Sequence, residues 1–136
     1  EVECGDHYAR ALASWGVYLA LMGFNYDGPN ARLTLAPRMS PERFRALFTT
    51  AEGWATFDQE RNSGKQTSRV LGQWGAIRIA TLALELADGM KPTHMVASVN
   101  GQAVEARMQR DGAKLTVDFA GPLALGIGDT LEVAIS

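Results

Sequence analysis

The side chains with the greatest capacity for chemistry gather in the first ten residues of the chain. They are three carboxylates, a thiol, an imidazole and a guanidinium: Glu1, Glu3, Cys4, Asp6, His7 and Arg10. An apolar segment follows at once, and charge placed against apolar surface is costly unless it is paired or used. The alternative is purely structural, with Glu1 and Glu3 on a frayed terminus and Asp6 as a helix cap.

Cys4 and His7 allow a different chemistry, because an imidazole can activate a thiolate nucleophile. A lone cysteine is more often a small core residue, so this pair ranks below the carboxylates and Arg10. The carboxylates beyond residue 10 fall in expected strands and turns without a pairing pattern. These carboxylates therefore offer no catalytic pair.

A separate candidate site is aromatic. Trp54 and Phe57 lie in one expected strand and Trp74 lies just after the next, and aromatic faces stack on the apolar patches of sugar rings. Core packing is the more common fate of such side chains. The sequence leaves both alternatives open, a sugar-stacking platform or three core residues.

The composition limits the classes of partner. The chain has 136 residues, 46% hydrophobic and 21% charged, with a formal net charge of −2, which is typical of a soluble globular protein. No Lys/Arg cluster is present, so we expect neither nucleic-acid nor anionic-membrane binding. The single cysteine excludes an intrachain disulfide, and no metal or cofactor is expected. A soluble protein is predicted, with the cytoplasm favoured and no transmembrane segment.

Residues 5–24 are predicted to form a helix that lacks a polar face. Tyr8, Leu12, Trp15, Leu19 and Met22 recur at spacings of three and four, which is the period of one helical stripe. Apolar side chains also occupy the other faces, and such a helix must be surrounded by protein. We therefore expect it to be buried, and the isolated chain to self-associate through residues 8–24 or to bind a larger partner.

The turn-rich sequence 25–30 marks the expected boundary between two segments, 1–26 and 27–136. Beyond it, the hydrophobic period changes from 3.6 to 2 in short runs, which is typical of an antiparallel sandwich. The expected fold class is therefore α+β: one long buried helix followed by an antiparallel β-sandwich-like module.

Three local features fix the expected geometry of the second segment. Asn100-Gly101 and Asp111-Gly112 both favour two-residue type I′ hairpin loops. The second loop would place Met108 opposite Leu115, and the three strands that the loops join would share one buried face. In residues 76–86 the apolar positions change parity, which predicts a β-bulge at Ala80-Thr81.

The N-terminal part of the chain resembles a known enzyme family. The residues that carry the resemblance are EVECGDHYARALASWG at 1–16, Phe24, YDGP at 26–29, APR at 36–38 and FTTAEGW at 48–54. They are similar to the C-terminal end of the catalytic domain in glycoside hydrolase family 116, the β-glucosidases and non-lysosomal glucosylceramidases. The similarity covers about residues 1–60.

The resemblance implies an (α/α)6 barrel whose last helix is residues 5–24. The family retains anomeric configuration with a Glu nucleophile and an Asp acid/base, both on upstream parts of the barrel, so the resemblance implies no catalytic residue in this chain. The family also places a Glu and an Arg, nine positions apart, around the outer hydroxyls of bound glucose, and these positions match Glu1 and Arg10. Glu3 is the reserve candidate, while Asp6 and His7 would hold the helix start in place.

Two functions are expected from these observations. In the first, the chain is the C-terminal fragment of a retaining β-glucosidase or glucosylceramidase-like glycoside hydrolase. It binds a β-glucoside or glucosylceramide-like substrate with the rest of the barrel and is inactive alone. The alternative is a β-sandwich carbohydrate-binding or protein-interaction module without catalysis, acting through Trp54 and Trp74. A third possibility is a stand-alone enzyme using Cys4 and His7. Because the sequence begins with Glu1, we also expect its N-terminus to be cut or processed.

Overall fold

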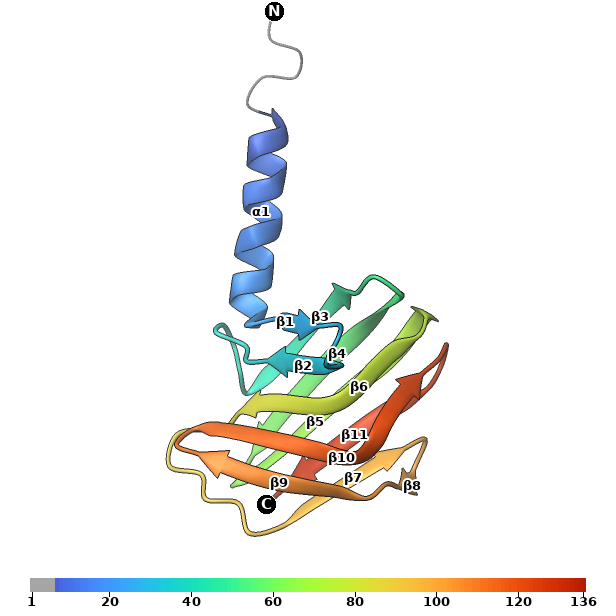
Figure 1. Cartoon of the computed structure of the whole chain (residues 1–136). Coiled ribbons are helices and arrows are strands. Elements are labelled where there is room, and N and C mark those ends of the chain that lie inside the picture. Colours follow the sequence, from blue (N-terminus) through green and yellow to red (C-terminus); the bar gives the residue numbers. More distant parts are fainter. Residues whose placement is uncertain (1–6) are drawn as a thin grey trace, which may run out of the picture.

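The computed structural model describes the backbone of residues 7–136 and the side chains of residues 11–136. Over this range one helix precedes a series of strands (Figure 1). The elements in chain order are α1 (His7–Met22), β1 (Asn25–Asp27), β2 (Arg32–Leu35), β3 (Arg43–Thr49), β4 (Gly53–Asn62), β5 (Lys65–Gly75), β6 (Ile77–Glu85), β7 (Met95–Val99), β8 (Gln102–Ala103), β9 (Ala106–Asp111), β10 (Lys114–Leu125) and β11 (Thr130–Ile135).

The strands form two sheets that face each other as a sandwich (Figure 1). The five-stranded sheet has the order β1-β2-β6-β10-β9, and the six-stranded sheet has the order β3-β4-β5-β11-β7-β8. The described strand pairs are antiparallel except β2 with β6, which run parallel. The predicted β-sandwich is thus present, with one parallel pair that the sequence did not indicate.

Apolar side chains from both sheets fill the space between them. In β4 the buried residues alternate with more exposed ones, as expected for a strand with one face toward a core. Burial of a Leu, Ile or Phe side chain contributes about 1.5–3 kcal/mol relative to exposure. The largest fully buried side chains are Phe48, Phe57, Met22, Leu33, Leu35, Ile77, Ile79, Leu82, Leu84, Leu115, Leu125 and Leu131.

Helix α1 is not buried, so the predicted α+β fold with a long buried helix, the last of an (α/α)6 barrel, is wrong. Its described side chains are mostly exposed: Leu12 is 73% and Val17 58% accessible. The helix extends away from one end of the sandwich (Figure 1). The two sheets already bury their apolar faces against each other, and no other element of residues 7–136 encloses the helix.

Among the described side chains of α1, those near its C-terminal end join the core. Met22 is fully buried, and the Tyr18 hydroxyl donates a hydrogen bond of 2.5 Å to the Leu47 carbonyl oxygen. The Phe24 and Phe48 rings lie 5.3 Å apart between centroids. Self-association through residues 8–24 and the division into 1–26 and 27–136 both stay predictions. No helix within residues 7–136 is long and apolar enough to cross a bilayer.

The first hairpin and the bulge are confirmed. Val99 pairs with Gln102, which leaves Asn100-Gly101 as a two-residue loop, and both loop residues have positive φ, 52° and 77°, as type I′ requires. The backbone N–H groups of Ala80 and Thr81 both donate to the Ala31 carbonyl, at 2.7 and 3.3 Å. The pairing of β6 with β10 also shifts its register here, with four residues of β10 between Asp118 and Leu123 opposite Ala80 alone. An irregularity is therefore present where the parity change predicts one.

The predicted second hairpin is displaced by one position along the chain. Asp111 pairs with Lys114, so the loop is Gly112-Ala113, with Gly112 at φ 59°. A glycine at the first loop position suits a type II′ turn, and Met108 therefore pairs with Val117 instead of Leu115. The expected single three-stranded face is also wrong, because β7 and β8 belong to one sheet and β9 and β10 to the other.

A buried amide cluster links the two sheets at one end of the core. Gln59 and Gln66 are fully buried. The Gln66 Nε2 donates to Gln59 Oε1 at 3.2 Å and to the Glu85 carbonyl at 3.1 Å. Arg61 donates from Nε to Gln66 Oε1 at 3.0 Å and from Nη2 to the Glu85 carbonyl at 2.6 Å. These bonds satisfy polar groups that would otherwise be costly in the interior.

We expect Gln66→Leu to lower the free energy of unfolding by about 1–3 kcal/mol. The leucine would remove the donor to Gln59 Oε1 and the acceptor of Arg61 Nε, which are buried or half-buried. Urea unfolding followed by tryptophan fluorescence measures the change. Gln109→Leu, at an exposed position of β9, is the control and should change stability by less than about 0.5 kcal/mol. Equal effects of the two substitutions would contradict a stabilising amide cluster.

Candidate functional site

Two tryptophans stand together on the outer face of the six-stranded sheet. Trp54 on β4 pairs directly with Trp74 on β5, and directly opposed residues place their Cβ atoms about 5 Å apart on one face. Trp54 is 37% and Trp74 62% exposed. Large aromatic side chains left exposed side by side are uncommon in a soluble protein, where scattered single apolar residues are the norm. The pair is therefore the first feature to explain by binding.

A bulge places Trp74 on this face. Ala55 pairs with Gly72 while Trp54 pairs with Trp74, so Gln73 has no cross-strand partner and the register shifts. Plain alternation from the buried Gly72 would send Trp74 inward. The bulge at Gln73 reverses the alternation, so Trp74 points outward instead. The Gln73 Nε2 donates to Thr56 Oγ1 at 3.4 Å, on the same outer face.

Phe57, the third residue of the predicted platform, does not belong to it. It is fully buried between the sheets and lies 6.3 Å from Phe44, measured between ring centroids. Since Phe57 follows Trp54 by three positions on one regular strand, its side chain points to the opposite face. The aromatic site thus consists of the two tryptophans, and Phe57 is a core residue.

Arg69 organises the charges on the same face. Its Nε lies 2.6 Å from Glu132 Oε2, and its Nη1 lies 3.6 Å from Asp58 Oδ1 and 4.0 Å from Glu60 Oε2. The hydrogen bond to Glu132 is the main cause that raises the pKa of Arg69 above its ordinary value. The guanidinium therefore stays charged and holds three carboxylates from strands β4 and β11. Such side chains offer donors and acceptors in defined directions.

A depression of about 260 Å³ lies over these strands. Thr56 pairs with Leu71, two positions from the tryptophan pair, and Asp58 pairs with Arg69 two positions further along. Arg45 on β3 pairs with Asp58 in register and has no ion pair among the described residues. The lining residues are Arg45, Thr56, Asp58, Arg69, Leu71 and Thr130. The depression adjoins the tryptophan pair along β4 and β5, and we call the two together the outer-face site.

The sequence carries a signal for Asp58 in its spacing from Trp54 along one strand. Thr56, Asp58 and Glu60 share the parity of Trp54 on β4, so they must share its face. Arg69 reaches that face only through the pairing of β4 with β5. The charge cluster thus depends on a strand register that no short motif marks.

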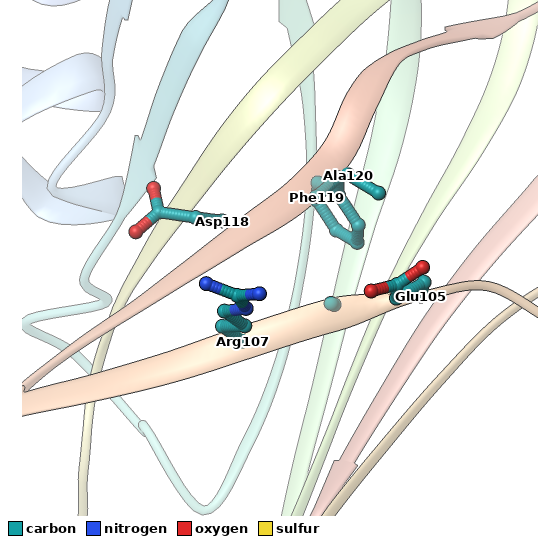
Figure 2. A pocket seen from close by; sticks show the side chains of 6 residues that line it. Glu105, Arg107, Asp118, Phe119 and Ala120 are labelled. Atoms are coloured by element: carbon teal, nitrogen blue, oxygen red, sulfur yellow. The ribbon is translucent and has the colours of Figure 1, made fainter.

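A second depression, of about 370 Å³, lies on the opposite sheet (Figure 2). Arg107 on β9 stands across from Asp118 on β10, and Asp118 Oδ1 accepts a hydrogen bond of 2.9 Å from the Thr81 hydroxyl. The aromatic residue that lines it, Phe119, is only 9% exposed and belongs to the core. This surface has charge without an exposed aromatic ring, so it is the weaker candidate for sugar binding.

The N-terminal candidates cannot be placed. Glu1, Glu3, Cys4 and Asp6 lie outside the described residues, and the side chains of His7 and Arg10 on α1 do as well. The predicted sugar contacts of Glu1 and Arg10 therefore stay predictions. Among the described residues no group of three or more His, Cys, Asp or Glu side chains is placed to hold a metal ion.

The fold and this site define a β-sandwich with an aromatic and charged outer face. No protein-family model matches the sequence, and no curated protein is significantly similar to it. Among solved structures, an alpha-L-rhamnosidase from Dictyoglumus thermophilum matches with a TM-score of 0.46 at 8% identity. The match covers 85% of this chain and 12% of that chain. A glycoside hydrolase is thus a distant structural neighbour, while membership of glycoside hydrolase family 116 is not shown.

Proposed function

We propose that this chain is a carbohydrate-binding module, of the accessory kind, whose ligand lies on the outer-face site. The observation that carries the proposal is the outward, register-paired position of Trp54 and Trp74 beside a network of arginines and carboxylates. Indole rings stack on the apolar faces of sugars. Guanidinium and carboxylate groups supply the donors and acceptors that sugar hydroxyls need.

A catalytic role for the outer-face site has less support. The carboxylates of Asp58, Glu60 and Glu132 all lie within 4.0 Å of Arg69, so each of them already has an ion-pair partner. A glycosidase needs two carboxyl groups that flank the glycosidic bond, one of them free to donate a proton to the leaving oxygen. Three carboxylates gathered around one guanidinium do not present such a pair. Binding without hydrolysis is therefore the activity we assign to this face.

We expect Trp74→Ala to weaken glycan binding at least tenfold, because a large exposed aromatic side chain at the centre of a site carries much of its binding energy. Isothermal titration of the 136-residue chain with neutral gluco-, manno- and xylo-oligosaccharides measures the affinity. Ile127→Ala removes another large exposed side chain, 72% accessible, and is the matched control. Unchanged binding in Trp74→Ala, or equal loss in both variants, would defeat the proposal.

A second, finer candidate is that the chain belongs to a family-116-like β-glucosidase or glucosylceramidase. Its support is the resemblance of residues 1–60, with Glu1 and Arg10 as the sugar contacts. On this proposal the isolated chain does not hydrolyse an aryl β-glucoside. Turnover that survives Glu1→Ala and Arg10→Ala would reject the assignment of these two residues.

A further inference from the structure

The outer-face site is longer than one sugar ring. From the tryptophan pair it continues along β4 and β5 through Thr56 and Leu71 to Asp58 and Arg69. Four residues of extended strand span about 13 Å. A single pyranose on the indoles cannot also reach the Arg69 cluster at the far end. Occupation of both ends needs several linked sugars.

Positive and negative side chains are equal in number among the residues that flank the site. In the strand register, Arg43 lies opposite Glu60 and Arg45 opposite Asp58, and Arg69 lies opposite Glu132. Three arginines thus lie among three carboxylates. The carboxylate of an acidic sugar would gain one arginine but approach carboxylates already in place, and like charges repel at short range. A neutral sugar has hydroxyl groups that both donate and accept hydrogen bonds, so it can use both kinds of side chain without this repulsion.

We infer that the outer-face site takes an extended segment of a neutral glycan, with at least three linked sugars. The chain lies along β4 and β5, with one sugar on Trp54 and Trp74 and a later one over Asp58 and Arg69. This inference rests on the proposed function and adds to it the length, direction and charge class of the ligand.

The test is a titration series with the 136-residue chain. Neutral gluco-, manno- and xylo-oligosaccharides of one to five units are compared with oligogalacturonates of the same lengths. We expect affinity for the preferred neutral series to rise at least tenfold between one and four units. Monosaccharide binding as tight as tetramer binding, or galacturonate tetramer binding that equals or exceeds the neutral tetramer, would overturn the inference. Each of these outcomes leaves the proposed function standing, whereas failure of all sugars to bind would remove both.

Two variants test the direction of the ligand. Arg69→Ala should weaken binding of the neutral tetramer at least fivefold and leave the disaccharide within twofold of its original affinity, because only the longer ligand reaches that end. Asp58→Asn, which keeps the side-chain shape, should also weaken binding of the tetramer more than binding of the disaccharide. Arg107→Ala on the opposite sheet is the control. Equal losses for tetramer and disaccharide in Arg69→Ala and Asp58→Asn would contradict a ligand that runs along the strands.

Discussion

Phe57→Ala is expected to lower the free energy of unfolding by about 3–5 kcal/mol, the range for removal of a buried phenylalanine ring. Phe57 is fully buried between the sheets and lies next to the ring of Phe44. The loss combines the transfer free energy of the ring with the cavity that a rigid core cannot close. A domain of ordinary stability holds only about 5–15 kcal/mol in total, so the variant should be close to unfolding. Urea denaturation at fixed protein concentration measures it.

Trp54→Ala is the matched control for Phe57→Ala, since both aromatic residues lie on β4, three positions apart. The Trp54 indole is partly exposed on the outer face, and its removal leaves no enclosed cavity. We expect its effect on stability to be less than half that of Phe57→Ala. Similar destabilisation by the two substitutions would mean that the tryptophan face is part of the structural core, which would also weaken its assignment as a binding surface.

Gly75→Ala is expected to destabilise the fold by about 2–4 kcal/mol, from left-handed strain and overpacking together. Gly75 has φ 68°, a conformation that a residue with a Cβ atom adopts at a cost. A Cβ atom there would also lie 2.1 Å from the Glu52 carbonyl oxygen. This oxygen belongs to the backbone, so it cannot rotate away as a flexible side chain could. The new Cβ atom would force the backbone to move. Because Gly75 follows Trp74 directly, this movement should also displace the indole and weaken glycan binding. Thermal unfolding and oligosaccharide titration of the same sample measure the two effects.

Gly64→Ala separates the two causes. Gly64 has φ 80°, yet nothing lies within 4 Å of the position where its Cβ atom would stand. This variant should therefore carry only the conformational strain, about 1–2 kcal/mol, and leave glycan binding unchanged. If Gly64→Ala were as damaging as Gly75→Ala, the close approach of Gly75 to Glu52 would not be the reason for the larger effect.

Most strands were predictable because they follow from local patterns, whereas β1 (Asn25–Asp27) lies in the segment that the sequence marked as turns. Alternation of apolar residues indicates a strand with one buried face, Asn100-Gly101 specifies its loop, and the parity change at Ala80-Thr81 marks a bulge. The second loop was not predictable to the residue, because glycine suits either position of a two-residue loop and Gly112 occupies the first. The division of β7 and β9 between two sheets depends on long-range pairing that no local signal encodes.

The helix was misjudged for a different reason. The pattern of residues 5–24 correctly indicates an α-helix, which the structure has over His7–Met22. Hydrophobicity on every face measures how much free energy burial would gain, but it does not say that this chain provides the covering surface. The side chains that the sandwich can accept are those near the last turn, such as Met22.

The binding face was only half predictable. Trp54 and Phe57, with an odd separation on one strand, must point to opposite sides, so the sequence could have rejected a platform containing both. Trp74 could not be assigned in this way, since the unpaired Gln73 reverses its side. Arg69 could not be assigned from the sequence either, because its place beside Asp58 and Glu132 depends on the register of β5 with β4 and β11.

The bulge at Gln73 lets β5 carry one residue more than its partner strand while Trp74 still stands opposite Trp54. Deletion of Gln73 would place the tryptophan directly after the inward Gly72, where strict alternation again points it outward. In evolutionary terms, the aromatic surface should therefore survive the loss of this single codon. Homologues with a β5 shorter by one residue should keep the tryptophan pair in regular register and lack the contact between Gln73 and Thr56.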